Sequence, residues 1–151
     1  MAQGSFAAQV SAWVKETKER QEAVYQGSAQ AIVAIMQTPR GAGGALRIDT
    51  GFLRASLTAV TGSAMPAQTM KPDGVEVFRY DPAPINLVIL GSKISEPITV
   101  VYTANYALPR EYGARGQAPD RWVALAAQRW PQVVEQECAK AKASVDSRAG
   151  G

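Results

Sequence analysis

The chain has 151 residues, the size of one domain, and 46% of them are hydrophobic, as in ordinary globular proteins. It contains no histidine, which excludes histidine-based catalytic triads and zinc sites, and its single cysteine leaves no partner for an internal disulfide. The net charge of +3 is small for a dedicated duplex-DNA binder, and no run of about 18 apolar residues predicts a membrane span.

The first predicted element is one long amphipathic helix over 5–36. Ser5 is expected to cap its start, and Thr38-Pro39 to end it. At about 1.5 Å per residue this helix would be roughly 48 Å long, more than the roughly 30 Å diameter of such a domain. We therefore expect another subunit to cover part of its apolar stripe. The stripe consists of Phe6, Val10, Trp13, Thr17, Val24, Ser28, Ile32 and Ile35.

Short strands and loops are predicted in the middle of the chain. A glycine-rich segment at 38–48 is expected to be a flexible loop, and 62–74 a surface loop. An irregular connector is expected at 106–116. The expected strands span 56–61, 75–78, 85–90 and 98–102.

The last predicted element is a helix from Pro119 to about Ala143, which Pro131 should kink or split in two. Residues 144–151 form a polar, glycine-ended tail that we expect to be frayed. Together these elements predict one α+β domain over 1–151. Its long N-terminal helix and its C-terminal helix would pack on a small antiparallel sheet of three to four strands.

The glycine-rich loop is flanked by Arg40 and Arg47. It lacks the phosphate-binding pattern of nucleotide-binding loops and follows no strand, so nucleotide binding is disfavoured. If the loop lined a pore, the two arginines would face DNA phosphates.

A first notable block follows at 49–56. Asp49 or Thr50 could cap a short helix, and Gly51 would keep space free beside that cap. Leu53 is expected to point inward and Arg54 outward. A simple helix cap explains this block when it is considered alone. The block reads Asp49-Thr50-Gly51-Phe52-Leu53-Arg54-Ala55-Ser56.

A second block contains Asn105-Tyr106-Ala107 and then Glu111-Tyr112-Gly113. The two tyrosines suit a core edge or an interface. Glu111 has no second carboxylate nearby in sequence, so a salt bridge to Arg54 or Arg115 is favoured over a role as general acid.

Two tryptophans, Trp122 and Trp130, lie eight residues apart in the predicted C-terminal helix. Core packing is the first interpretation, and a share in a subunit interface is the second.

The ordered set of blocks resembles the tail-completion (neck) family of lambda-like and related long-tailed phages, also described as head–tail joining or minor tail proteins. Its D-T-G-x-L-R-x-S pattern is matched at 49–56. Its N-x-x-Y-A-x-x-x-E-Y-G pattern is matched, with a shortened Asn–Tyr spacing, at 105–113, and its Q-A-P turn at 117–119. The resemblance extends from about Phe6 to Val134. The matching residues are Asp49, Thr50, Gly51, Leu53, Arg54, Ser56, Asn105, Tyr106, Glu111, Tyr112, Gly113 and Pro119.

This resemblance implies a non-enzymatic virion protein without a cofactor, assembled in the host cytoplasm. It would form a ring, commonly sixfold and alternatively twelvefold, whose lumen passes DNA without sequence-specific contact. Its neighbours would be a head-closure (stopper) protein and a tail-terminator or tail-tube protein. Arg40, Arg47, Trp122 and Trp130 are candidates for the interface or lumen.

Three alternatives stay open. A tail-terminator ring would cap the tail tube instead of bridging it to the head. A small nucleic-acid-binding module would show DNA affinity that falls steeply with salt. A carboxylate-based hydrolase would need two facing acids in a cleft.

Overall fold

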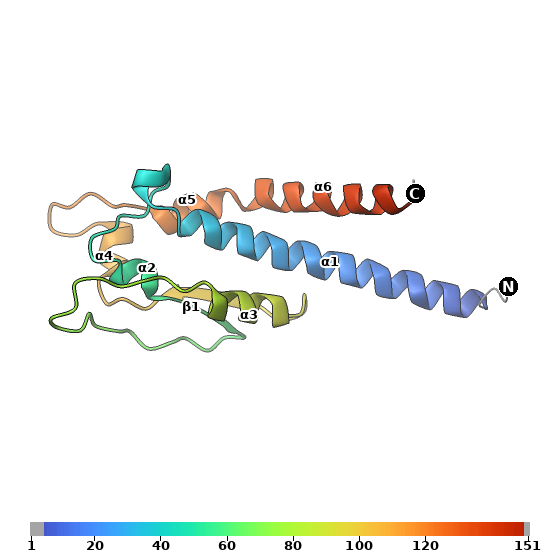
Figure 1. Ribbon diagram of the computed structural model, residues 1–151, viewed down its shortest axis with the longest axis horizontal. Coiled ribbons are helices and arrows are strands. Elements are labelled where there is room, and N and C mark those ends of the chain that lie inside the picture. Colours follow the sequence, from blue (N-terminus) through green and yellow to red (C-terminus); the bar gives the residue numbers. More distant parts are fainter. Residues whose placement is uncertain (1–4, 150–151) are drawn as a thin grey trace.

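One long helix dominates the computed structural model, which describes residues 5–149 (Figure 1). Helix α1 spans Phe6–Met36, and the predicted start and end are both confirmed. The Ser5 side chain accepts a hydrogen bond from the Ala8 backbone N–H at 3.2 Å and so caps the helix. Gln37 forms the other end, two residues before Pro39.

Eight shorter elements follow α1 in the described chain (Figure 1). They are the 3-10 turn η1 (Arg40–Ala42), α2 (Phe52–Ala55), β1 (Leu57–Thr61), α3 (Ala83–Gly91), β2 (Ile98–Tyr102), α4 (Ala107–Tyr112), α5 (Trp122–Gln128) and α6 (Trp130–Ala149).

The described residues form a two-stranded antiparallel sheet, in which Leu57 of β1 lies opposite Tyr102 of β2 and Thr61 opposite Ile98. The α+β class and the strands expected at 56–61 and 98–102 are therefore confirmed. The expected sheet of three to four strands is not.

The strand expected at 85–90 was wrong, because this segment lies within helix α3. A short apolar run has no periodicity that separates a buried strand from a buried helix. The helix buries Ile85 and Ile89, four residues apart, and Pro84 sits in its first turn, where no N–H is needed. The Asp81 carboxylate accepts a hydrogen bond from Ala83 N–H at 3.0 Å beside that turn.

The strand expected at 75–78 was also wrong, since this segment has no regular secondary structure. It meets the rest of the fold through the Phe78 N–H, which donates to the Thr50 carbonyl at 2.9 Å. The connector at 106–116 is not wholly irregular, because it contains α4. Pro109 is the third residue of α4, where a missing N–H costs no helical hydrogen bond.

The C-terminal helix is split in two at Arg129, as Pro131 predicted, but it starts at Trp122 instead of Pro119. Helix α6 continues to Ala149. The helix end expected at Ala143 was therefore wrong. The frayed tail expected from residue 144 was also wrong for residues 144–149, which are helical. Residues 150–151 lie outside the described part of the chain.

The core lies where α1 ends. There α1 contacts α5 and α6 on one side and α3 on another, and α3 in turn contacts β1 (Figure 1). The first turns of α1 project past the end of α6, and the whole N-terminal half of α1 lies outside this core (Figure 1). The core cluster consists of Val33, Met36, Leu46, Phe52, Leu53, Leu57, Ala59, Ile85, Ile89, Ala104, Trp122 and Ala126.

Candidate functional site

The block at 49–56 builds a tight entry into α2. Gly51 has φ +86°, and a Cβ on it would lie 2.5 Å from the Phe78 carbonyl oxygen, so only glycine fits there without a shift. The Thr50 hydroxyl accepts a hydrogen bond from Phe52 N–H at 3.3 Å. The N-cap residue itself is Gly51, so neither expected side chain occupies the N-cap position; Thr50 contacts the helix from one residue earlier, and Asp49 is exposed.

The end of the same block connects α2 to the sheet. Leu53 is buried, which confirms its inward orientation, and Leu57 is buried as well. The Ser56 hydroxyl donates to the Leu53 carbonyl at 2.7 Å. The Ser56 carbonyl accepts from the N–H and from the hydroxyl of Thr103, at 3.2 and 3.1 Å, beyond the end of β2. Ser56 thus holds α2 against both strands.

Arg54 does not point outward as predicted. Its Nε donates to the Gln37 carbonyl at 3.0 Å, and its guanidinium lies 5.3 Å from the centroid of the Tyr80 ring. Gln37 returns a bond from Nε2 to the Arg54 carbonyl at 2.9 Å, and its Oε1 accepts from the Tyr102 hydroxyl at 2.7 Å. Burial raises the pKa of Tyr102. This network joins the end of α1 to α2 and β2.

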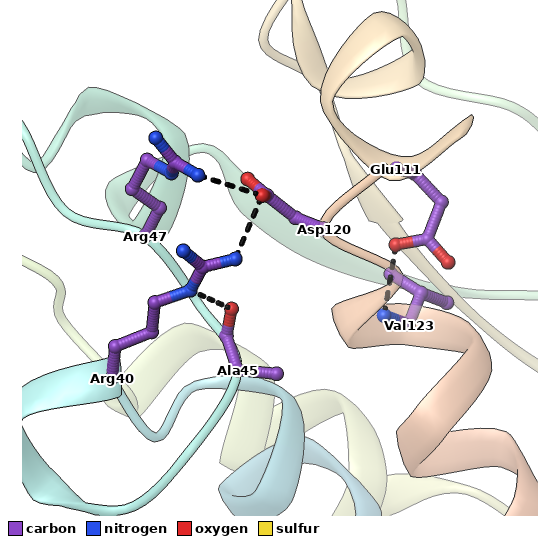
Figure 2. A network of polar contacts seen from close by, with 6 residues as sticks. All are labelled: Arg40, Ala45, Arg47, Glu111, Asp120 and Val123. Atoms are coloured by element: carbon purple, nitrogen blue, oxygen red, sulfur yellow. Dashed lines mark hydrogen bonds and ion pairs between the residues drawn. The ribbon is translucent and has the colours of Figure 1, made fainter. Parts of the chain in front are cut away.

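Glu111 of the second block is a helix cap. Its side chain is buried, and one carboxylate oxygen accepts from the Val123 N–H at 3.0 Å (Figure 2). The other accepts from the Ala124 N–H at 2.8 Å. These N–H groups lie in the first turn of α5, where the helix dipole favours a negative charge. The predicted salt bridge to Arg54 or Arg115 was therefore wrong, because the carboxylate is held by backbone groups.

Gly113 closes the turn that leads to α5. It has φ +84°, and a Cβ on it would lie 2.9 Å from the Gln117 carbonyl oxygen and 3.2 Å from the Pro119 ring. The segment with Gln117 and Pro119 thus folds directly onto Gly113. Tyr112, the residue before Gly113, is exposed.

The two blocks meet through aromatic rings. Phe52 lies 6.0 Å from Tyr106 and 5.0 Å from Phe78, measured between ring centroids. Burial raises the pKa of Tyr106. The Asn105 side chain is exposed, and its backbone N–H donates to the Thr69 carbonyl at 2.9 Å. Segments about fifty residues apart in sequence thus form one structural unit.

The glycine-rich loop is closed onto this unit by Asp120. One oxygen of the buried Asp120 carboxylate pairs with Arg40 Nη2 at 2.8 Å and with Arg47 Nη2 at 3.2 Å (Figure 2). Arg40 Nε also donates to the Ala45 carbonyl at 3.3 Å (Figure 2). The neighbouring Leu46 is fully buried. The sequence reasoning missed Asp120. Its only signal was an acid directly before a helix, with two arginines in a distant loop.

A polar cavity of about 480 Å³ lies between the two blocks. Its charged lining consists of Arg47, Asp49, Arg54, Lys71, Glu76 and Arg110. The four cations outnumber the two acids, and Glu76 is exposed and pairs with Lys71 at 3.7 Å. This excess of cations suits contact with an anionic group.

The two tryptophans have different surroundings. Trp122 is buried, with its ring centroid 5.3 Å from that of Tyr102, so its core role is confirmed. Trp130 is 40% exposed and lines an apolar groove of about 720 Å³ between α1 and α6. Other apolar residues along this groove are Val24, Ile94, Val134, Ala141 and Val145.

No group of three or more potential metal ligands occurs among residues 5–149. Over the same residues, no helix is long and apolar enough to cross a membrane. In comparisons with known protein families, curated proteins and solved structures, none matches the chain.

Proposed function

We propose that this chain is a structural subunit of a phage neck, a tail-completion protein whose copies form a ring between the head-closure protein and the tail. The proposal starts from the resemblance carried by the blocks at 49–56 and 105–113. It gains support from how those blocks are used in the fold.

Three charged side chains support a structural role because their partners lie within the chain. Glu111 and Arg54, from the two blocks, cap α5 and bind the end of α1, and Asp120 holds the glycine-rich loop. A hydrolase would need one of these carboxylates in a cleft beside a second acid or a nucleophile. A rigid frame that presents surfaces to neighbours requires no such group.

The observation that carries the proposal is the uncovered apolar surface of α1. Phe6 is 81% exposed and Trp13 63% exposed, on a helix that extends beyond the body of the protein. Large exposed apolar patches mark sites of association. A ring of identical subunits covers such a surface when each subunit contributes two different faces.

A complementation experiment tests this function in the phage that encodes the chain. Without the gene, we expect DNA-filled heads and complete tails to accumulate separately. Purified protein added to such an extract should restore joined, infective particles. Normal joining without the protein, together with its absence from purified particles, would exclude the proposal. Tails of irregular length would instead assign the chain to a terminator ring.

DNA binding provides a second readout. Arg40 and Arg47 already pair with Asp120, so the structure offers no free pair of cations in this loop. We expect weak duplex binding without sequence preference. A tight complex whose affinity falls steeply with salt would favour the nucleic-acid-binding module.

A further inference from the structure

One apolar face of helix α1 is exposed near the N-terminus and packs beside α6 further along the helix. We define the arm as residues 6–19, the part of α1 that precedes the groove lining and whose first turns project beyond α6 (Figure 1). The stripe formed by Phe6, Val10, Trp13 and Thr17 continues at helical spacing into Val24 and Ser28. Val24 and Ser28 line the apolar groove against α6. The arm's stripe is therefore the uncovered continuation of an interface that is already formed within the chain.

The groove has the dimensions and the chemistry of this arm. Its lining on α6 runs from Trp130 to Asp146, which at about 1.5 Å per residue is roughly 24 Å, and the arm measures roughly 20 Å. Residues 6–14 of the arm carry no charged side chain. The charged lining residues Arg20, Lys142 and Asp146 lie at the end of the groove nearest the arm, because α1 and α6 run antiparallel (Figure 1).

A chain cannot fill its own groove with its own arm. A Cβ on Gly27 would lie 2.5 Å from the Glu137 carboxylate, so these two residues are level with each other. Val10 lies further toward the N-terminus of the same rigid helix, at a distance of about 25 Å from Gly27. The occupant must therefore come from another molecule.

We propose that the arm of one copy docks in the groove between α1 and α6 of a second copy, and that this is the contact which closes the ring. The inference rests on the proposed function. Each copy then offers one arm and one groove, which is the head-to-tail arrangement that a closed ring requires. Two arms packed on each other would cover the stripe but would leave both grooves open.

A single contact of this kind is weak. Rings the size of Phe6 and Trp13 each bury about 150–250 Å², whereas a standard interface buries about 800 Å² per partner. Association in solution is therefore best detected by covalent trapping.

The single cysteine, Cys138, lines the groove and supplies the trap. In a Val10→Cys variant, the arm of one copy would carry a thiol to the Cys138 of the next. Mild oxidation should give dimers and a ladder of larger species, with a Val10–Cys138 disulfide identified by mass spectrometry. An internal disulfide is out of reach, because the two Cα atoms must come within about 7 Å.

Matched variants make the result specific. Ala12→Cys places the thiol at nearly the same height but away from the stripe, and should give at least a fivefold lower yield. Adding Trp13→Glu to Val10→Cys should lower the yield similarly, while the unfolding transition stays unchanged. Equal yields from Val10→Cys and Ala12→Cys would overturn the inference. The inference would also be overturned if Val10→Cys gave the same yield of dimers after Cys138 is replaced by serine. That result would show that two arms pair with each other.

The failure of this contact can be distinguished from failure of the proposed function. If the Val10–Cys138 link never forms but complementation still joins heads to tails, only the arm-to-groove contact is wrong. If complementation also fails and particles lack the protein, the neck function falls with it.

Discussion

Glu111 illustrates how a motif residue can be identified from sequence while its partner cannot. The block at 105–113 singled out Glu111, but the sequence favoured an arginine as the partner of its carboxylate. In the fold its carboxylate accepts two backbone N–H groups at the start of α5. Those donors become neighbours only after the turn at Gly113 reverses the chain. Sequence spacing cannot reveal a partner that a distant turn provides.

Replacing Glu111 with glutamine should therefore weaken stability and not a reaction. We expect Glu111→Gln to lose about 1–3 kcal/mol of unfolding free energy, because one oxygen and the negative charge at the helix start are removed. Urea denaturation followed by circular dichroism measures the loss. Glu135→Gln, on the exposed surface of α6, is the charge-matched control and should change stability by less than about 0.5 kcal/mol. Similar losses in both variants would contradict the capping role.

The Tyr102 hydroxyl gives a pH-dependent prediction. Because burial raises its pKa, the folded protein keeps the proton at pH values where the unfolded chain, with a pKa near about 10, loses it. Its contribution to stability is thus complete below about pH 10 and is lost as pH rises above that value. Tyr102→Phe also removes the hydrogen bond to Gln37 and should cost about 1 kcal/mol at pH 8. The difference between wild type and variant should shrink above pH 10 in urea titrations. A difference that grows with pH would contradict a buried, protonated tyrosine.

At the scale of elements, the glycine-rich loop shows how composition can mislead. Its glycines predict a flexible segment, yet Leu46 is buried and Asp120 holds two arginines across the loop. The arginine side chains are about half exposed, so solvent weakens their ion pairs with the buried Asp120 carboxylate. The main effect of these pairs is to fix the position of the loop.

Releasing the loop should therefore appear in proteolysis and not in global unfolding. We expect Asp120→Asn to speed tryptic cleavage after Arg40 or Arg47 several-fold, because both guanidinium groups lose their anchor. Asp73→Asn, in the exposed loop before α3, is the control and should leave these cleavage rates unchanged. Unaltered cleavage in Asp120→Asn would show that other contacts fix the loop.

Elements with a clear period were predictable, and elements without one were not. The three- and four-residue spacing in α1 and the β-branched run in β2 predicted both elements correctly. The apolar run at 85–90 has no such period. It forms a helix because Pro84 and Asp81 before it favour a helix start. Residues 75–77 alternate in polarity but follow Pro72 and Gly74, and no neighbouring strand pairs with them along their length.

At the scale of the whole molecule, the central feature is the separation of the core from the arm. The core gathers around the end of α1, and the arm extends beyond it with its aromatic residues uncovered. The length of the helix predicted this surplus surface from sequence alone. The groove that accompanies it could not be predicted, because it depends on how α6 packs against α1.

Two tryptophan substitutions separate the roles of core and arm. Trp122→Ala should lose about 3–5 kcal/mol of unfolding free energy, because the ring is buried against Tyr102. Trp13→Glu should leave that free energy within about 0.5 kcal/mol of wild type and still abolish joining in the complementation assay. A Trp13→Glu variant that joins heads to tails normally would show that the arm is not needed for assembly.

Electron cryo-microscopy of the mature particle tests the central claim most directly. We expect density for a closed ring of this chain at the junction of head and tail, with the N-terminal half of every α1 covered by an adjacent copy. A particle in which the protein is absent from that junction, or present there with a solvent-exposed arm, would contradict the account.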